Sequence, residues 1–204
     1  MSTMFTNVGN YSQYCQEILK EYSFPDTKRG KDLNYEWPKT KYQDLPTVIM
    51  KICHDACTSA EDTELLESNP DVIVERHHKI LSKDGKVKNN FAVHSDRDGP
   101  AGGPCRSLLY YYHIDEEIDD VGLHFYKWCD EYEIETTTDK PITTFTPVSG
   151  DVITFDDNIP HCPGNFKTDS ETPKVRGVLA IFIKHPTIET SKPRSCMSWL
   201  SCLF

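Results

Sequence analysis

Apolar residues in the first third of the chain recur at helical spacing. In 11–22 (YSQYCQEILKEY) they fall on one face, and Pro25 ends the pattern. In 45–66 they return at helical intervals, at Val48, Ile49, Ile52, Cys53 and Ala56 and then at Leu65 and Leu66. The pattern predicts a helix over 11–22, one long helix from residue 45 onward, and a short second helix before residue 66.

Beyond Asn69-Pro70 the pattern becomes that of β-strands. Two extended runs flank 83–86 (KDGK), and an Asp-Gly pair between such runs is a strong hairpin signal. Further extended runs lie at 107–114, 122–128, 142–145, 151–155 and 175–183. Many short strands separated by turn residues, with no helical pattern between them, predict a β-sandwich or barrel.

Together these patterns predict one domain of mainly β structure with N-terminal helices. A chain of 204 residues is long enough for a single hydrophobic core. We divide it into a helical N-terminal part at 1–70 that packs on the core, a β core at 71–186, and a C-terminal tail at 187–204. No repeat, low-complexity segment or sharp change of composition marks a second domain in the sequence.

The net charge and the distribution of apolar residues indicate which partners and which cellular location to expect. A net charge of −10 argues against a protein that holds a nucleic-acid backbone, because phosphate binding requires a clustered surplus of Lys and Arg. No secretory signal opens the sequence, and no apolar run reaches the ~18 residues that cross a bilayer. We therefore expect an intracellular, cytoplasmic protein without a membrane segment.

The eight cysteines are scattered along a chain that is too long to need disulfides, so we expect reduced thiols. Cys53, His54 and Cys57 resemble part of a zinc site. However, they fall inside a helical pattern, and no second pair follows at zinc-finger spacing. Buried or half-buried helix residues are the better interpretation of this group.

A polar stretch with metal-binding character follows the predicted hairpin. FAVHSDRDG, at 91–99, places His94 and Asp96 two residues apart at the end of an extended run. Side chains two apart on a strand share a face, so both can point into one cavity while Ser95 points away. Taken alone, the pattern also fits a strand that runs into a polar turn.

His161 is the third candidate ligand. It follows the predicted strand 151–155, and in a jelly roll that strand runs beside the one that carries His94. Two imidazoles and one carboxylate on one side of an ion form the facial triad of non-haem Fe(II), which leaves positions open. Shared metal binding requires the nearest imidazole nitrogens to lie within about 6 Å of each other. Asp156 and Asp157 either orient His161 or are solvated loop carboxylates.

The order of these segments resembles the 2-oxoglutarate and Fe(II)-dependent dioxygenases, most closely their prolyl-hydroxylase-type branch. The pieces that carry the resemblance are HSD at 94–96, LLYYYHID at 108–115 with GLHFY at 122–126, TPVSGDVITFDDNIPH at 146–161, and VRGVLAIFIK at 175–184. The resemblance implies a double-stranded β-helix core, which is a jelly-roll or cupin-like fold. It also implies that His94, Asp96 and His161 bind Fe(II).

The resemblance further implies a basic residue that pairs with the distal carboxylate of 2-oxoglutarate. Arg176 opens the strand after His161, where the family carries this residue, and a guanidinium forms two parallel charge-assisted hydrogen bonds with a carboxylate. The chain departs from the family in an inserted loop at 167–174 and in Gly177, where many relatives carry a hydroxyl group. Lys184, at the far end of the strand, is the alternative anchor.

Tyrosines are a second expected contact to the cosubstrate. Alternation along a strand places Tyr110 and Tyr112 on one face and Tyr111 on the other. Counting from Asp96, we assign Tyr110 to 2-oxoglutarate binding, with Tyr112 nearby. At least two of the three aromatic side chains are expected to fill the β core.

The activity that the resemblance implies is hydroxylation of a C–H bond, with dioxygen consumed, succinate and carbon dioxide released, and ascorbate as a supporting reductant. The carboxylate of Asp96 favours hydroxylation, because halogenating relatives lack it. The branch points to a prolyl or other protein side chain, and the acidic composition suits a basic protein or a small molecule better than DNA. A non-catalytic binding domain and a non-redox cupin-like metal-binding domain stay open as alternatives, and neither needs Arg176.

Overall fold

The computed structural model describes residues 4–16, 33–36, 40–83, 93–96, 105–127 and 140–184. The helices in these parts are α2 (Thr47–Ala56) and α3 (Ala60–Glu67), and short 3-10 turns lie at Ser12–Tyr14 and Tyr42–Asp44. The strands are β1 (Thr6–Asn10), β2 (Leu33–Glu36), β3 (Thr40–Lys41), β4 (Asp71–Leu81), β5 (Cys105–Ile114), β6 (Leu123–Phe125), β7 (Thr143–Phe145), β8 (Asp151–Asp156), β9 (His161–Pro163) and β10 (Lys174–Lys184).

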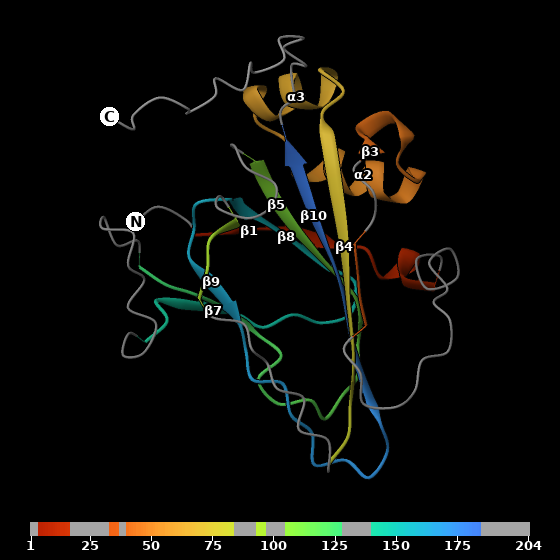
Figure 1. Ribbon diagram of the computed structural model, residues 1–204, viewed down its shortest axis with the longest axis vertical. Helices are drawn as coiled ribbons and strands as arrows, with labels where there is room; N and C mark the ends of the chain where they lie inside the picture. Colours follow the sequence, from red (N-terminus) through yellow and green to blue (C-terminus); the bar gives the residue numbers. More distant parts are fainter. Residues whose placement is uncertain are drawn as a thin grey trace, which may run out of the picture.

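The strands form two antiparallel sheets of unequal size (Figure 1). The seven-stranded sheet has the order β1-β8-β5-β10-β4-β2, with β3 also paired to β4. The three-stranded sheet has the order β7-β6-β9. The two central strands, β5 and β10, have hydrogen-bonded neighbours on both sides, so the backbone that carries their side chains is fixed by two sets of interstrand hydrogen bonds.

The large sheet buries both of its faces. One face, which we call the outer face, packs against α2 and α3 through apolar side chains such as Ile52, Leu66 and Ile181 (Figure 1). The other face, which we call the inner face, packs against the small sheet through Phe155 and Phe125. Alternating side chains of β5, β8 and β10 therefore enter two separate cores.

Local sequence explains the two helices. The buried residues of α2 recur at helical spacing, and Pro46 precedes its first residue. In α3, the Ser59 side chain accepts a hydrogen bond from the Asp62 amide at 3.0 Å, which caps the first turn. Neither helix, nor any other in the described ranges, has the length and apolar content needed to cross a membrane.

The prediction of mainly β structure, with strands over most of the segments expected after residue 70, agrees with the observed sheets. The prediction for the first 70 residues needs correction, because β1, β2 and β3 belong to the large sheet. Over the predicted helix at 11–22, the described residues form a 3-10 turn at Ser12–Tyr14 that continues into helical backbone at Cys15 and Gln16. Residues 17–22 lie outside the described parts, so the rest of that helix stays a prediction. The second strand of the predicted hairpin also lies mostly outside them.

Candidate functional site

His94 and His161 meet across an isolated antiparallel bridge. The amide of His94 donates to the His161 carbonyl at 3.0 Å, and the amide of His161 donates back at 2.8 Å. Because directly opposed residues share a face, the two rings lie together, with centroids 4.5 Å apart. The expectation that the strand 151–155 lies beside His94 is thus wrong, since the partner is the first residue of β9.

Asp96 completes a cluster with the two histidines. The Oδ1 atom of Asp96 lies 3.8 Å from Nε2 of His94 and 3.7 Å from Nε2 of His161. One ligand atom from each of the three side chains lies within 4.8 Å of the others, well inside the 6 Å limit that shared metal binding requires. Within the described ranges, no other group of His, Cys, Asp and Glu side chains has this geometry.

The environment of His161 favours a neutral imidazole that faces the cluster. Its Nδ1 bonds the Ile159 carbonyl at 2.9 Å, and a carbonyl can only accept, so Nδ1 carries the proton. The lone pair of Nε2 therefore faces Asp96. Burial lowers the pKa of His161, which outweighs the opposing effect of the Asp96 carboxylate. Phe155 and Phe125 pack against the ring, with centroids at 4.8 and 6.4 Å.

Arg176 lies on the inner face of β10, buried to 4% exposure. Its guanidinium carbon is 4.0 Å from the centroid of the Phe166 ring and 5.5 Å from that of Tyr111. Burial lowers the pKa of Arg176 to about 10, which still leaves it charged at neutral pH. Its Nε has no hydrogen-bond partner among the described residues. A buried cation with an unpaired donor is costly unless a ligand completes it.

Two further side chains that sequence reasoning did not select border this guanidinium. Tyr111 is fully buried, and its hydroxyl has no hydrogen-bond partner among the described residues. Burial raises the pKa of Tyr111 to about 12, so the hydroxyl keeps its proton. Lys79, 1% exposed, is the direct neighbour of Arg176 across β4 and β10, and its amino group lies 5.4 Å from the centroid of the same Phe166 ring. The inner face thus carries two buried cationic side chains beside a tyrosine hydroxyl that has no hydrogen-bond partner among the described residues.

No protein-family model and no curated protein sequence matches the chain. Solved structures match it in fold. IDO from Bacillus thuringiensis has a TM-score of 0.60 at 12% identity, over 90% of this chain and 91% of that chain. An oxidoreductase of the 2OG-Fe(II) oxygenase family from Burkholderia pseudomallei has a TM-score of 0.51 at 12% identity, over 89% and 84%. A Pseudomonas putida prolyl-4-hydroxylase also matches, with a TM-score of 0.47 at 10% identity over 90% and 94%.

The chain has the fold of a 2OG-Fe(II) oxygenase. The resemblance expected from the sequence is therefore confirmed at the level of the fold. Phe166, the residue directly before the inserted segment 167–174, covers the Arg176 guanidinium. Gly177 is explained as well, since a Cβ there would overlap the ring of Tyr112.

The structure corrects the assignment of Tyr110 and Tyr112 to the cosubstrate. Both side chains lie on the outer face, opposite to Arg176. The Tyr110 hydroxyl donates to the Tyr11 carbonyl at 3.0 Å, and the Tyr112 hydroxyl accepts from Nε of Arg76 at 2.6 Å. Counting from Asp96 assigned the tyrosines to the wrong faces of β5. Tyr111, and not Tyr110 or Tyr112, lies on the inner face beside Arg176.

The other residues considered from the sequence lie away from the metal cluster or have structural contacts. Asp156 pairs with Arg106 rather than orienting His161, whose Nδ1 bonds a backbone carbonyl instead. Lys184 lies at the far end of β10 from Arg176, opposite Asp71. Cys53 and Cys57 are buried in and beside α2, and burial raises the pKa of Cys57 to about 12, which favours inert thiols.

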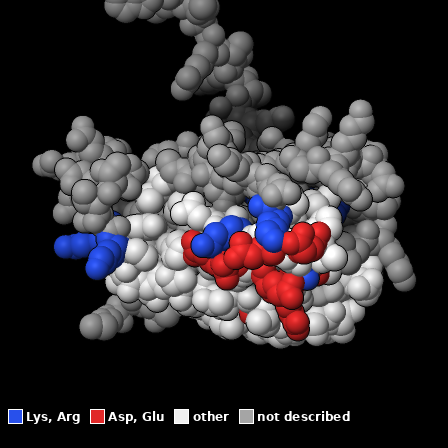
Figure 2. Space-filling model, turned by 90° about the horizontal axis from the view of Figure 1, so that it is seen from below, with Lys and Arg blue, Asp and Glu red and all other residues white. Residues whose placement is uncertain are grey.

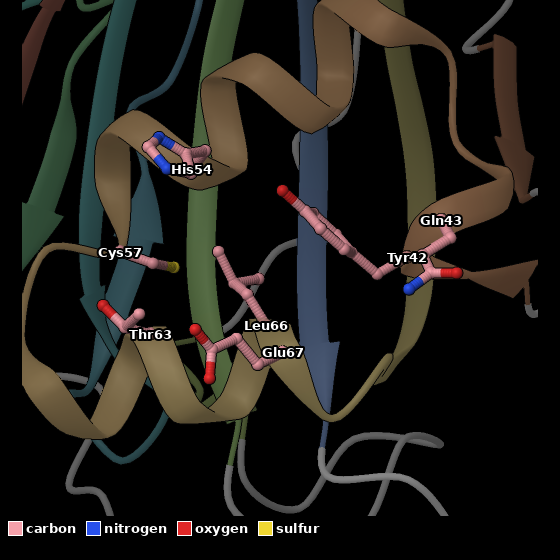
Figure 3. Close-up of a pocket in the computed structure, with 7 residues that line it drawn as sticks. All are labelled: Tyr42, Gln43, His54, Cys57, Thr63, Leu66 and Glu67. Carbon is pink, nitrogen blue, oxygen red and sulfur yellow. The ribbon is translucent and has the colours of Figure 1, made fainter.

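A cavity of about 290 Å³ lies on the helix-covered side of the molecule (Figure 3). Its lining comes from α2, α3 and the turn before α2, and consists of Tyr42, Gln43, His54, Cys57, Thr63, Leu66 and Glu67. Several of these residues pack with the outer-face core. The cavity is therefore separate from the His94, Asp96 and His161 cluster, which packs with the inner-face core.

Proposed function

We propose that the chain is an Fe(II)- and 2-oxoglutarate-dependent dioxygenase that hydroxylates a C–H bond. The observation that carries the proposal is the combination of the three-ligand cluster with a buried, incompletely bonded Arg176 on the same inner face. A metal site alone would leave the buried guanidinium unexplained. An oxygenase needs it, because one end of 2-oxoglutarate must bind away from the metal.

The residues present fit an iron ion and its cosubstrate. Two neutral imidazoles and one carboxylate suit Fe(II) and leave coordination positions open. When bound, the iron and 2-oxoglutarate supply the oxidising chemistry, with dioxygen consumed and succinate and carbon dioxide released. The protein itself orients the ligands and shields them from water. The Ile159 carbonyl fixes the tautomer of His161, and Phe155 covers the His161 ring.

Arg176 and Tyr111 form the site for the distal carboxylate. The guanidinium supplies charge and a fork of donors, and the buried Tyr111 hydroxyl supplies one more donor. Lys79 adds a second positive charge next to Arg176. These groups favour an anion with a carboxylate end, and they replace the assignment of Tyr110 and Tyr112.

For the substrate we propose a basic peptide or protein, with a prolyl or other side chain as the position hydroxylated. The net charge of −10 supports a cationic partner. Figure 2, which views the end where β10 begins, shows acidic side chains gathered in a strip with Lys and Arg side chains beside it. The loop after β5 supplies exposed carboxylates at this end, at Glu116, Glu117, Asp119 and Asp120. Lys174 and Lys167 neutralise only part of them.

The first experiment is anaerobic titration of the purified protein with Fe(II) and 2-oxoglutarate. A visible metal-to-ligand charge-transfer band is expected in the wild type and is expected to be absent in His161→Ala. Succinate release from 2-oxoglutarate, measured with ascorbate and a panel of basic proline-containing peptides, then tests turnover. A folded, metal-loaded protein without the band would contradict the proposal.

A further inference from the structure

Ser107 lies beside the candidate metal cluster on β5, a central strand of the large sheet. It is fully buried on β5. Its backbone pairs with Phe155 of β8 on one side and with Phe182 of β10 on the other. Because β5 has a hydrogen-bonded strand on each side, the Ser107 side chain extends from a fixed point on the inner face.

The Ser107 hydroxyl donates to one oxygen of Asp96, and the histidines lie near the other. Oγ of Ser107 donates to Oδ2 of Asp96 at 2.6 Å, a length typical of a hydroxyl bonded to an ionised carboxylate. The other oxygen, Oδ1, is the one that lies 3.8 and 3.7 Å from the Nε2 atoms of His94 and His161. The two oxygens of Asp96 therefore differ in their contacts: Oδ2 is hydrogen-bonded to Ser107, and Oδ1 lies near both histidines.

We infer that Ser107 is a positioning residue that makes Asp96 offer a single oxygen to the metal, an inference that rests on the proposed function. A carboxylate can bind an ion through one oxygen or through both. If both bound, one more coordination position would be filled, and the cosubstrate or dioxygen would lose it. The hydrogen bond from Ser107 restrains Oδ2 and orders the side chain before the ion arrives.

The restraint acts on metal affinity as well as on geometry. Hydrogen bonds to ligating side chains hold them in the binding orientation, and their removal lowers metal affinity by about 10- to 100-fold. The Asp96 side chain is 9% exposed, so few water molecules can replace the lost donor. Deleting the hydroxyl frees the carboxylate to rotate, and ordering it again opposes metal binding.

The test uses Mn(II) as a spin probe, with free Mn(II) measured by electron paramagnetic resonance in the absence of 2-oxoglutarate. Ser107→Ala is expected to weaken Mn(II) binding by about 10-fold or more, and Ser107→Thr, which keeps the hydroxyl, is expected to restore most of it. Ser107→Cys keeps the volume with a weak donor and tests the same bond where the Ala variant does not fold. Ser149→Ala is the matched control, since it removes a serine hydroxyl that bonds Ile114 instead.

The outcomes separate this inference from the proposed function. Wild-type Mn(II) affinity in both Ser107→Ala and Ser107→Cys would overturn the role of Ser107 and leave the metal site in place. Failure of the folded wild type to bind Mn(II) would overturn both. A loss of affinity in Ser149→Ala equal to that in Ser107→Ala would also reject the inference, because the effect would then be a general loss of stability.

Discussion

The two faces of the large sheet use the same kinds of side chain differently. On the outer face, the hydroxyls of Tyr110 and Tyr112 are hydrogen-bonded, and Arg76 donates to Tyr112. On the inner face, Tyr111 and Arg176 are equally buried, but the tyrosine hydroxyl and the arginine Nε have no partner among the described residues. Consecutive residues of β5 thus face two different environments.

The difference separates a stabilising core from a binding site. A buried polar atom without a partner costs about 1–3 kcal/mol, so folding alone favours the bonded arrangement of the outer face. The inner face retains unbonded donors beside a three-ligand cluster, which is the arrangement that a charged ligand completes. Substitutions on the inner face should therefore affect binding, and those on the outer face should affect stability.

The largest expected effect is the loss of the metal site in His161→Ala. Removing one of three ligands should abolish measurable Fe(II) binding and turnover, while the protein stays folded. Calorimetric metal titration measures the binding, and circular dichroism checks the fold. His124→Ala is the control, because that ring bonds Asp120 and Thr144 away from the cluster. Retained stoichiometric metal binding in His161→Ala would remove this residue from the ligand set.

The second effect is on the cosubstrate. Arg176→Met should weaken 2-oxoglutarate binding by about 10- to 100-fold, since each hydrogen bond to a charged group contributes about 1.5–3 kcal/mol. Metal affinity should stay at the wild-type value. The charge-transfer band measures 2-oxoglutarate affinity under anaerobic conditions. Arg76→Met, its outer-face counterpart, should lower the free energy of unfolding and leave the affinity for 2-oxoglutarate unchanged. A loss of 2-oxoglutarate affinity in Arg76→Met but not in Arg176→Met would refute the distinction between the faces.

The three tyrosines give a finer test of the same distinction. Tyr111→Phe should weaken 2-oxoglutarate binding by about fivefold, which corresponds to the loss of one hydrogen bond of about 1 kcal/mol. Tyr110→Phe and Tyr112→Phe should each lower the free energy of unfolding by about 1 kcal/mol without a change in 2-oxoglutarate affinity. Urea denaturation and anaerobic titration are the two measurements. Equal binding losses in all three variants would mean that the faces do not differ in function.

The last expected effect, a pH dependence that comes from the outer face, concerns stability and leaves ligand binding unchanged. Burial, followed by the charges of Arg76 and His113, lowers the pKa of His78 from 6.5 to about 4. The folded protein thus holds His78 neutral, and the unfolded chain takes up its proton more readily. Its contribution to stability is complete above pH 6.5 and is lost as the pH falls towards 4. The urea midpoint should fall between pH 7 and 5, and it should fall less in His78→Gln.

Much of the candidate site could be predicted from the sequence. His94 and Asp96 are two residues apart at the end of an extended run, and His161 follows a strand with an apolar pattern, so the three candidate ligands were recognisable before their positions were known. Arg176 was recognisable as a cation at the start of a buried strand. These residues could be selected from local sequence, because the residue type and its place at the end or start of a predicted strand were sufficient.

The tyrosines could not be assigned in the same way. Alternation pairs Tyr110 with Tyr112, but which face they occupy depends on packing with α2, α3 and Tyr11, and no local signal encodes that packing. β5 also has a register irregularity opposite Gly177 and Leu179, which makes counting along the strand less reliable. β1 was missed because TNVGN lacks an apolar alternation, and its pairing with β8 is a tertiary contact.

The backbone bridge between His94 and His161 links ion binding to local folding. In the described part of the chain, two reciprocal hydrogen bonds form the whole backbone pairing between His94 and His161, two of the three candidate ligands. An ion held by both rings adds its binding free energy to the opening of that pairing. Amide hydrogen exchange at these two positions should therefore slow as iron binds, so the exchange rate would report the fraction of protein that holds iron.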